Sequence, residues 1–131
     1  MNIFTYDKSF EGLLTTIFDS YAMKIVPDQI VPEDIWQSNF FGTNYSIITD
    51  EKKAERVWNG LEKKLSGKAC QMPYRAFLSE LNSEMLIYKF TKKVFETSYN
   101  IEKNFSDDVV LEMKQLNRKV TREACRMVEF I

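Results

Sequence analysis

The sequence contains no histidine. Without an imidazole, the chain cannot build a Ser-His-Asp or Cys-His catalytic group from its own residues. Its two cysteines, Cys70 and Cys125, form no CxxC motif, so the ligands of a structural zinc site are also missing. Acid–base chemistry would have to use Glu, Asp, Lys or Tyr. We therefore expect no catalytic residue, no metal and no cofactor, and whether the chain is an enzyme stays open.

Glycine and long hydrophobic runs are also scarce. The four glycines are isolated and form neither a P-loop nor a GxGxxG motif. No apolar run approaches the roughly 20 residues of a membrane-spanning helix, and the N-terminus lacks the basic and apolar regions of a signal peptide. These absences predict a cytoplasmic protein that has no membrane partner and keeps its two thiols reduced, although a disulfide stays open.

The chain does have the apolar residues that a folded core requires. Hydrophobic residues make up 44% of its 131 residues and aromatic residues 14%, while charged residues make up 28%. This balance is typical of a globular protein, and the length is typical of one domain. We predict a single domain over 1–131.

Two short segments rich in β-forming residues predict strands, at Ile3–Tyr6 and Asn44–Thr49. Between them, Pro27 and Pro32 predict that 25–42 is mostly loop. Two strands alone do not make a stable sheet, so either helices cover them or further strands exist.

Apolar residues at helical spacing predict five helices, over about 9–23, 50–65, 69–81, 83–97 and 107–130. The first begins at Ser9, a suitable N-cap. The fold class is therefore α+β and predominantly α-helical, with about five helices, two short strands in the N-terminal half and a long last helix.

The last predicted helix carries an apolar seam and a basic stripe. The seam consists of Val109, Met113, Leu116, Val120, Ala124 and Met127. The stripe consists of Lys114, Arg118, Arg122 and Arg126 at i, i+4 spacing, with Lys119 beside them. Like charges at this spacing repel unless something neutralises them, and arginine suits bidentate phosphate contacts. Three interpretations stay open: a solvated face paired with carboxylates, a nucleic-acid site, or a protein-binding surface.

Two further clusters are weaker candidates. Tyr74 and Arg75 are adjacent, and this combination can stack a base and hold a phosphate. The alternative is a core aromatic residue whose hydroxyl lies at the edge of the core. Lys89, Lys92 and Lys93 form the other cluster, for which a solvated helix face is the simpler interpretation.

Charge is unevenly distributed along the chain. Residues 1–50 contain seven acidic and two basic residues, whereas residues 51–131 contain twelve acidic and sixteen basic residues. The C-terminal part can therefore favour an anionic partner, although its excess of positive charge is far below that of a dedicated DNA-binding protein.

Four segments resemble an uncharacterised bacterial family associated with DNA metabolism and repair. They are Phe4–Leu14, Val57–Leu61, Tyr74–Glu80 and Arg118–Met127, in the order in which the family has them. The resemblance implies a partner, a radical S-adenosylmethionine protein, and some family members are fused to a uracil-DNA glycosylase domain. It also implies a longer protein, of which this chain is the N-terminal half. The family usually has histidine where this sequence has Cys125, so any role of that histidine is in doubt here.

Three functions follow as expectations. The first is a DNA metabolism and repair accessory domain that binds nucleic acid or a partner repair enzyme through the basic stripe. The second is a protein-interaction module that docks the radical S-adenosylmethionine protein without touching DNA. The third is part of an enzyme whose active site needs a missing C-terminal half. The candidate binding residues are Arg118, Arg122, Arg126, Lys114, Lys119, Tyr74 and Arg75. Oligomeric state is not predicted.

Overall fold

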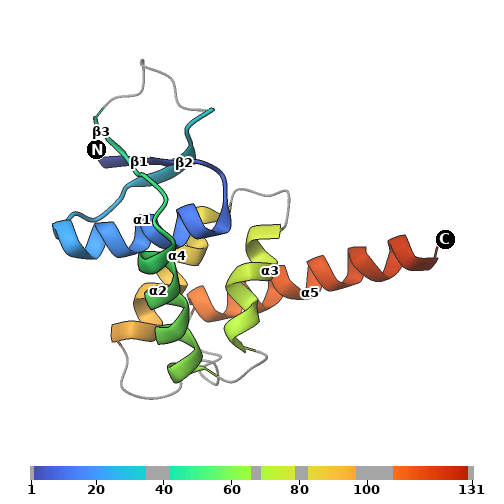
Figure 1. The fold of residues 1–131 in the computed structure, drawn as a ribbon. Helices are drawn as coiled ribbons and strands as arrows, with labels where there is room; N and C mark the ends of the chain where they lie inside the picture. The colour runs from blue at the N-terminus through green and yellow to red at the C-terminus, as the bar shows by residue number, and fades with distance from the viewer. Residues whose placement is uncertain (1, 35–41, 66–68, 79–82, 97–107, 130–131) are drawn as a thin grey trace. The chain divides into compact units, whose positions relative to one another are not determined.

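The computed structural model describes all residues except 1, 35–41, 66–68, 79–82, 97–107 and 130–131; for residues 69 and 120–129 it describes only the backbone. The described part is α+β and predominantly helical, which confirms the predicted fold class (Figure 1). The chain divides into two compact units, Met1–Gly60 and Leu61–Ile131. The prediction of a single domain over 1–131 stays a prediction.

The first unit is built on a parallel sheet in which β1 (Asn2–Tyr6) lies between β2 (Gln29–Pro32) and β3 (Thr43–Ser46). The β1 residues Ile3, Phe4, Thr5 and Tyr6 are all buried, so both faces of the central strand are covered. This burial is expected of a parallel sheet, whose strands read as continuous runs of β-forming residues rather than as alternating ones.

Strand β2 lies within 25–42, where the sequence predicted no strand; the other described residues of this range, 25–28, 33–34 and 42, are in neither helix nor strand, and 35–41 lie outside the described residues. Ile30 and Val31 are β-branched residues that pair with β1, and Pro32 ends the strand opposite Tyr6. Proline is tolerated there because β2 is an edge strand of the described sheet. The next amide, of Glu33, donates to the Tyr6 carbonyl at 2.8 Å. Strand β2 is thus a further strand beside the two that were predicted, which is one of the alternatives left open for the sheet.

Helix α1 (Phe10–Met23) confirms the first predicted helix and its cap. Ser9 has an extended backbone, and its hydroxyl accepts from the Gly12 amide at 2.9 Å. The helix buries Leu13, Leu14 and Ile17. It ends at Lys24, whose φ of 57° places it in the left-handed region usual for a helix C-cap.

Helix α2 (Glu51–Lys64) confirms the second predicted helix and crosses from the first unit into the second. Asp50 caps it, because its Oδ1 accepts from the Lys52 amide at 2.9 Å. The fold of the second unit continues with η1 (Ala69–Gln71), α3 (Met72–Leu78), α4 (Glu84–Glu96) and α5 (Asp108–Glu129).

The helix predicted over 69–81 is divided in the structure. Residues Ala69–Gln71 form a 3-10 turn, and the α-helix begins at Met72. Pro73 lies in the first turn of α3, where a residue without an amide proton is tolerated, and it cannot donate to a preceding turn. The helix therefore starts later than the apolar pattern suggests, while α4 and α5 keep their predicted bounds to within about two residues.

The buried side of α5 differs from the predicted apolar seam. Val110, Met113 and Asn117 are buried, whereas Val109 and Leu116 are only half-buried. Of the predicted seam, Met113 is thus confirmed, and the side chains of Val120, Ala124 and Met127 lie outside the described residues. A search for apolar periodicity could not place Asn117 in the core, because its amide is polar.

Candidate functional site

The basic stripe lies on a helix that is unbroken from Asp108 to Glu129. This confirms the backbone geometry behind the predicted i, i+4 row, since residues four apart on an α-helix are neighbours. Arg118 and Lys119 are exposed, and Lys114 is half-buried. The side chains of Arg122 and Arg126 lie outside the described residues. We use "basic face" for the five positions Lys114, Arg118, Lys119, Arg122 and Arg126.

Neither Arg118 nor Lys119 forms an ion pair with any residue whose side chain the structure describes. By contrast, among the described side chains of the first unit, Lys53 forms an ion pair with Asp19, with 2.8 Å between Nζ and Oδ1. The hydrogen bond that Lys53 donates to Asp19 raises the pKa of Lys53, and the negative charge of Asp19 adds to this effect. A basic face neutralised by carboxylates, the first interpretation of the stripe, thus has no support at these two positions.

Helix α3 carries the other two candidate residues and packs on α5. The Asn117 amide of α5 donates to the Met72 carbonyl of α3 at 3.1 Å. Asn117 directly precedes Arg118, and Met72 is two residues before Tyr74, so the contact joins the helices close to both candidate groups. Tyr74 is 41% exposed, so it is not the core aromatic residue of the alternative interpretation. Arg75 is exposed as well. The structure therefore places the Tyr74–Arg75 pair and the basic face on two helices that are in contact.

The weaker lysine cluster lies on α4. Lys89 is exposed, while Lys92 and Lys93 are half-buried. Among the cysteines, Cys70 is a buried thiol, and the side chain of Cys125 lies outside the described residues. Across the described residues, no group of three or more Cys, Asp or Glu side chains could hold a metal ion.

A second polar cluster, which the sequence did not predict, lies where β1 leads into α1. Asp7 accepts hydrogen bonds from the hydroxyl and the amide of Ser9, and from the Thr49 hydroxyl at 2.7 Å. The Ser9 hydroxyl is the main reason why the pKa of Asp7 is lowered; burial opposes the shift and the Thr49 hydroxyl adds to it. The only signal in the sequence was a serine cap followed by Gly12.

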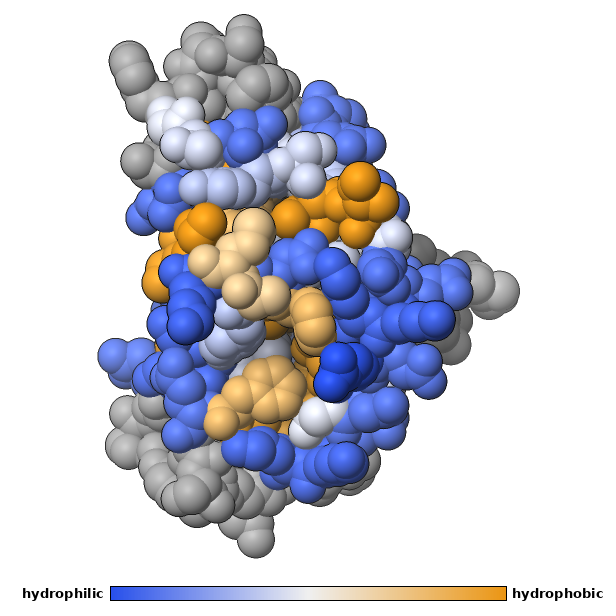
Figure 2. All heavy atoms as spheres, turned by 60° about the vertical axis from the view of Figure 1, so that its left-hand side comes forward, coloured by the Kyte–Doolittle hydropathy of each residue, from blue (hydrophilic) through white to orange (hydrophobic). Residues whose placement is uncertain are grey.

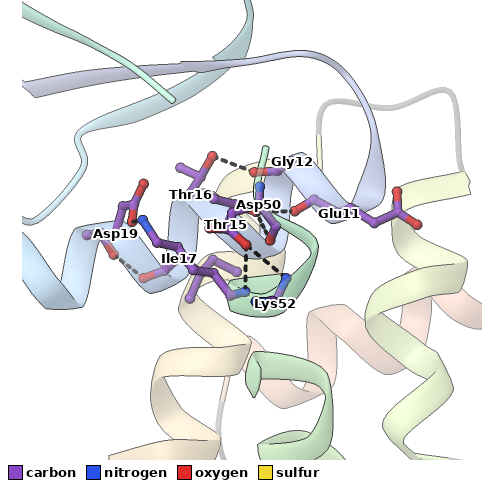
Figure 3. A network of polar contacts seen from close by, with 10 residues as sticks. Glu11, Gly12, Thr15, Thr16, Ile17, Asp19, Asp50 and Lys52 are labelled. Carbon is purple, nitrogen blue, oxygen red and sulfur yellow. Dashed lines mark hydrogen bonds and ion pairs between the residues drawn. The ribbon is translucent and has the colours of Figure 1, made fainter. Parts of the chain in front are cut away.

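Thr15 extends this cluster to the start of α2, as Figure 3 shows. The single proton of its buried hydroxyl is shared between the Glu11 carbonyl at 2.7 Å and the Asp50 carbonyl at 3.2 Å. The Asp50 amide also lies 3.2 Å from this hydroxyl, at donor distance. These contacts bind the segment before α2 to α1, so they hold the first unit together and leave few of their own groups for a ligand.

Hydrophilic residues cover most of the face in Figure 2, and hydrophobic residues appear there in small patches. Among the described helices, none is both long and apolar enough to cross a bilayer.

The C-terminal part of the chain matches a known protein family. Residues 81–131 are similar to a domain of unknown function, DUF4130. No curated protein and no solved structure matches the chain. The similar region contains α4 and α5, and therefore the whole basic face. The C-terminal part of this chain thus resembles an uncharacterised family in the region that carries the candidate site.

Proposed function

We propose that this chain is an accessory protein of DNA metabolism that binds nucleic acid through the basic face of α5. The observation that carries the proposal is the exposure of Arg118 and Lys119 on an unbroken helix, where neither pairs with a described carboxylate. The Tyr74–Arg75 pair on the adjoining helix α3 adds an exposed aromatic ring and a guanidinium, which together suit a base and its phosphate.

The charge on the helix supports an anionic partner. Cations four residues apart on a helix repel by a few tenths of a kcal/mol per pair, and this cost disappears when phosphates lie opposite them. From Lys114 to Arg126 the row of cations extends over about 18 Å of the helix, so it can follow a few phosphates of one strand.

The resemblance to proteins of DNA repair supports the choice of nucleic acid among anions. On this proposal the chain performs no reaction itself. It brings DNA to an enzyme, either a radical S-adenosylmethionine protein or a glycosylase, and that enzyme supplies the chemistry.

The test is binding of fluorescently labelled single- and double-stranded DNA, measured by anisotropy over a series of salt concentrations. We expect wild-type affinity to fall steeply with salt. Arg118→Glu plus Lys119→Glu should weaken binding by about tenfold or more and reduce the slope of log K against log salt by roughly 2.

A matched control keeps the net charge equal. Lys52→Glu plus Lys63→Glu reverses two exposed lysines on α2, outside the basic face, and should change affinity much less. Absence of DNA binding by the wild type even at low salt, or equal weakening by both double variants, contradicts the proposal.

One observation favours a second function, docking of a protein partner. Tyr74 and Leu78 lie four residues apart on α3 and are 41% and 57% exposed, so one side of this helix presents apolar surface. Copurification of the radical S-adenosylmethionine protein in the absence of DNA, lost on Leu78→Glu and kept on Arg118→Glu plus Lys119→Glu, would favour this second function over DNA binding.

A further inference from the structure

Asn117 is a polar residue on the buried side of α5. It is 7% exposed and follows the apolar residues Val110 and Met113 on that side of the helix. Its amide nitrogen donates to the Met72 carbonyl of α3 at 3.1 Å and to the Met113 carbonyl of its own helix at 2.9 Å. Both amide protons are therefore used.

The amide oxygen of Asn117 is buried and has no hydrogen-bond partner among the residues whose side chains the structure describes. Rotating the amide by 180° does not help, because the oxygen would then face two carbonyl oxygens. A leucine at this position would avoid the unpaired oxygen and bury more apolar surface. The asparagine is thus less favourable for packing than an apolar residue, so stability alone does not explain why this position is polar.

We propose that Asn117 is a positioning residue that fixes the register of α5 on α3, and thereby the place of the basic face beside Tyr74 and Arg75. An apolar seam allows one helix to slide past another by a turn at little cost, because one apolar contact replaces another. Sliding α5 would separate the Asn117 amide from the Met72 carbonyl, so one of the two buried amide protons would lose its acceptor while the other stays bonded to Met113. Only one register satisfies the amide protons.

Only the expected effect on DNA affinity rests on the proposed function, because the register of α5 on α3 can be measured without DNA. Gln71 and Gln115 are exposed, lie near the Met72–Asn117 contact and are outside the basic face. Spin labels on cysteines at these two positions, in a background with Cys70→Ala and Cys125→Ala, report the distance between η1 and α5 by pulsed electron paramagnetic resonance.

With Asn117 present, we expect one narrow distance distribution. Asn117→Leu should add a second population, displaced by up to about 5 Å, the rise of one helical turn. The melting temperature of Asn117→Leu should be equal to that of the wild type or higher. The apparent affinity for DNA should fall in proportion to the fraction of Asn117→Leu molecules in which α5 is outside the native register.

Thr91→Val is the matched control. Thr91 on α4 is buried as well, and its hydroxyl has no partner among the described residues, so valine removes a similar defect without touching the contact between α3 and α5. It should leave the distance distribution unchanged. If Asn117→Leu does not fold, Asn117→Ala, which adds no volume, takes its place in the same measurement.

A single unchanged distance in the Asn117 variant overturns the inference, and so does equal broadening in Thr91→Val. If the distances change as expected but the wild type binds no DNA, the proposed function fails while the role of Asn117 in setting the register is supported.

Discussion

The Thr49 hydroxyl donates to the Asp7 carboxylate at 2.7 Å, and this contact joins the end of β1 to the segment between β3 and α2. Gly12 makes the contact possible. A Cβ built at Gly12 would overlap Asp7 Oδ1 and lie 2.9 Å from Thr49 Oγ1 and 3.0 Å from Ser9 Oγ. The carboxylate and both hydroxyls therefore occupy the space that any other side chain would need.

Gly12→Ala should destabilise the protein by about 1–3 kcal/mol, because the methyl group must displace the Asp7 carboxylate from its partners. Urea unfolding measures the change, with Glu11→Ala at the exposed preceding position as the control. Helix propensity alone predicts the opposite, a gain of about 1 kcal/mol. A more stable Gly12→Ala variant would show that the carboxylate moves without cost.

Asp7 should give the protein a pH-dependent stability. Its folded pKa is lowered below the ordinary 3.8 because the charged form accepts the Ser9 and Thr49 hydrogen bonds. The stabilisation is therefore complete above the ordinary pKa and is lost as the pH falls through the lowered folded pKa. Asp7→Asn should be less stable than the wild type at pH 6, and the difference should shrink below pH 4. Urea midpoints of both proteins between pH 2.5 and 6 check this, and a constant difference would contradict it.

Thr15→Val should destabilise the protein by about 1–2 kcal/mol, because the Asp50 amide and carbonyl both lose a partner. Thr16 offers a matched control in the same helix. It is equally buried, but its hydroxyl donates only to the Gly12 carbonyl one turn earlier, at 2.8 Å. Thr16→Val should therefore be nearly neutral in thermal unfolding. Equal losses in the two variants would mean that the contact with Asp50 contributes nothing.

Lys24→Gly should stabilise the protein by up to about 1 kcal/mol. Lys24 ends α1 in the left-handed region, with a φ of 57°, where a residue with a Cβ is strained and glycine is not. Lys24→Ala removes the same charge but keeps the Cβ, so it should show no such gain. A gain in both variants would assign the effect to charge rather than to backbone conformation.

Local signals in the sequence were enough to predict α1. Ser9 caps the helix by accepting a hydrogen bond from the amide of Gly12, only three positions away, and Leu13, Leu14 and Ile17 have the helical period. The basic face was predictable for the same reason, since i, i+4 spacing fixes neighbours once a helix is assumed.

Strand β2 and the cluster around Asp7 could not be predicted in this way. Pro32 is a loop signal unless one knows that its strand lies at the edge of the sheet. Asp7 and Thr49 are 42 positions apart, and only the pairing of β1 with β3 brings them together. Asn117 was missed because its burial depends on a carbonyl of another helix.

The order of the strands also has a consequence for how the first unit forms during synthesis. The central strand leaves the ribosome before the two strands that pair with it, and both described pairings, of Ile3 with Gln29 and with Asn44, are parallel, so neither can form as a hairpin. Closing these long loops costs entropy before any pairing repays it, so the sheet should assemble slowly. Until both Gln29–Pro32 and Thr43–Ser46 have emerged, the segment Ile3–Tyr6 lacks at least one of its two partner strands, and a nascent chain in this state is expected to be a substrate for chaperones.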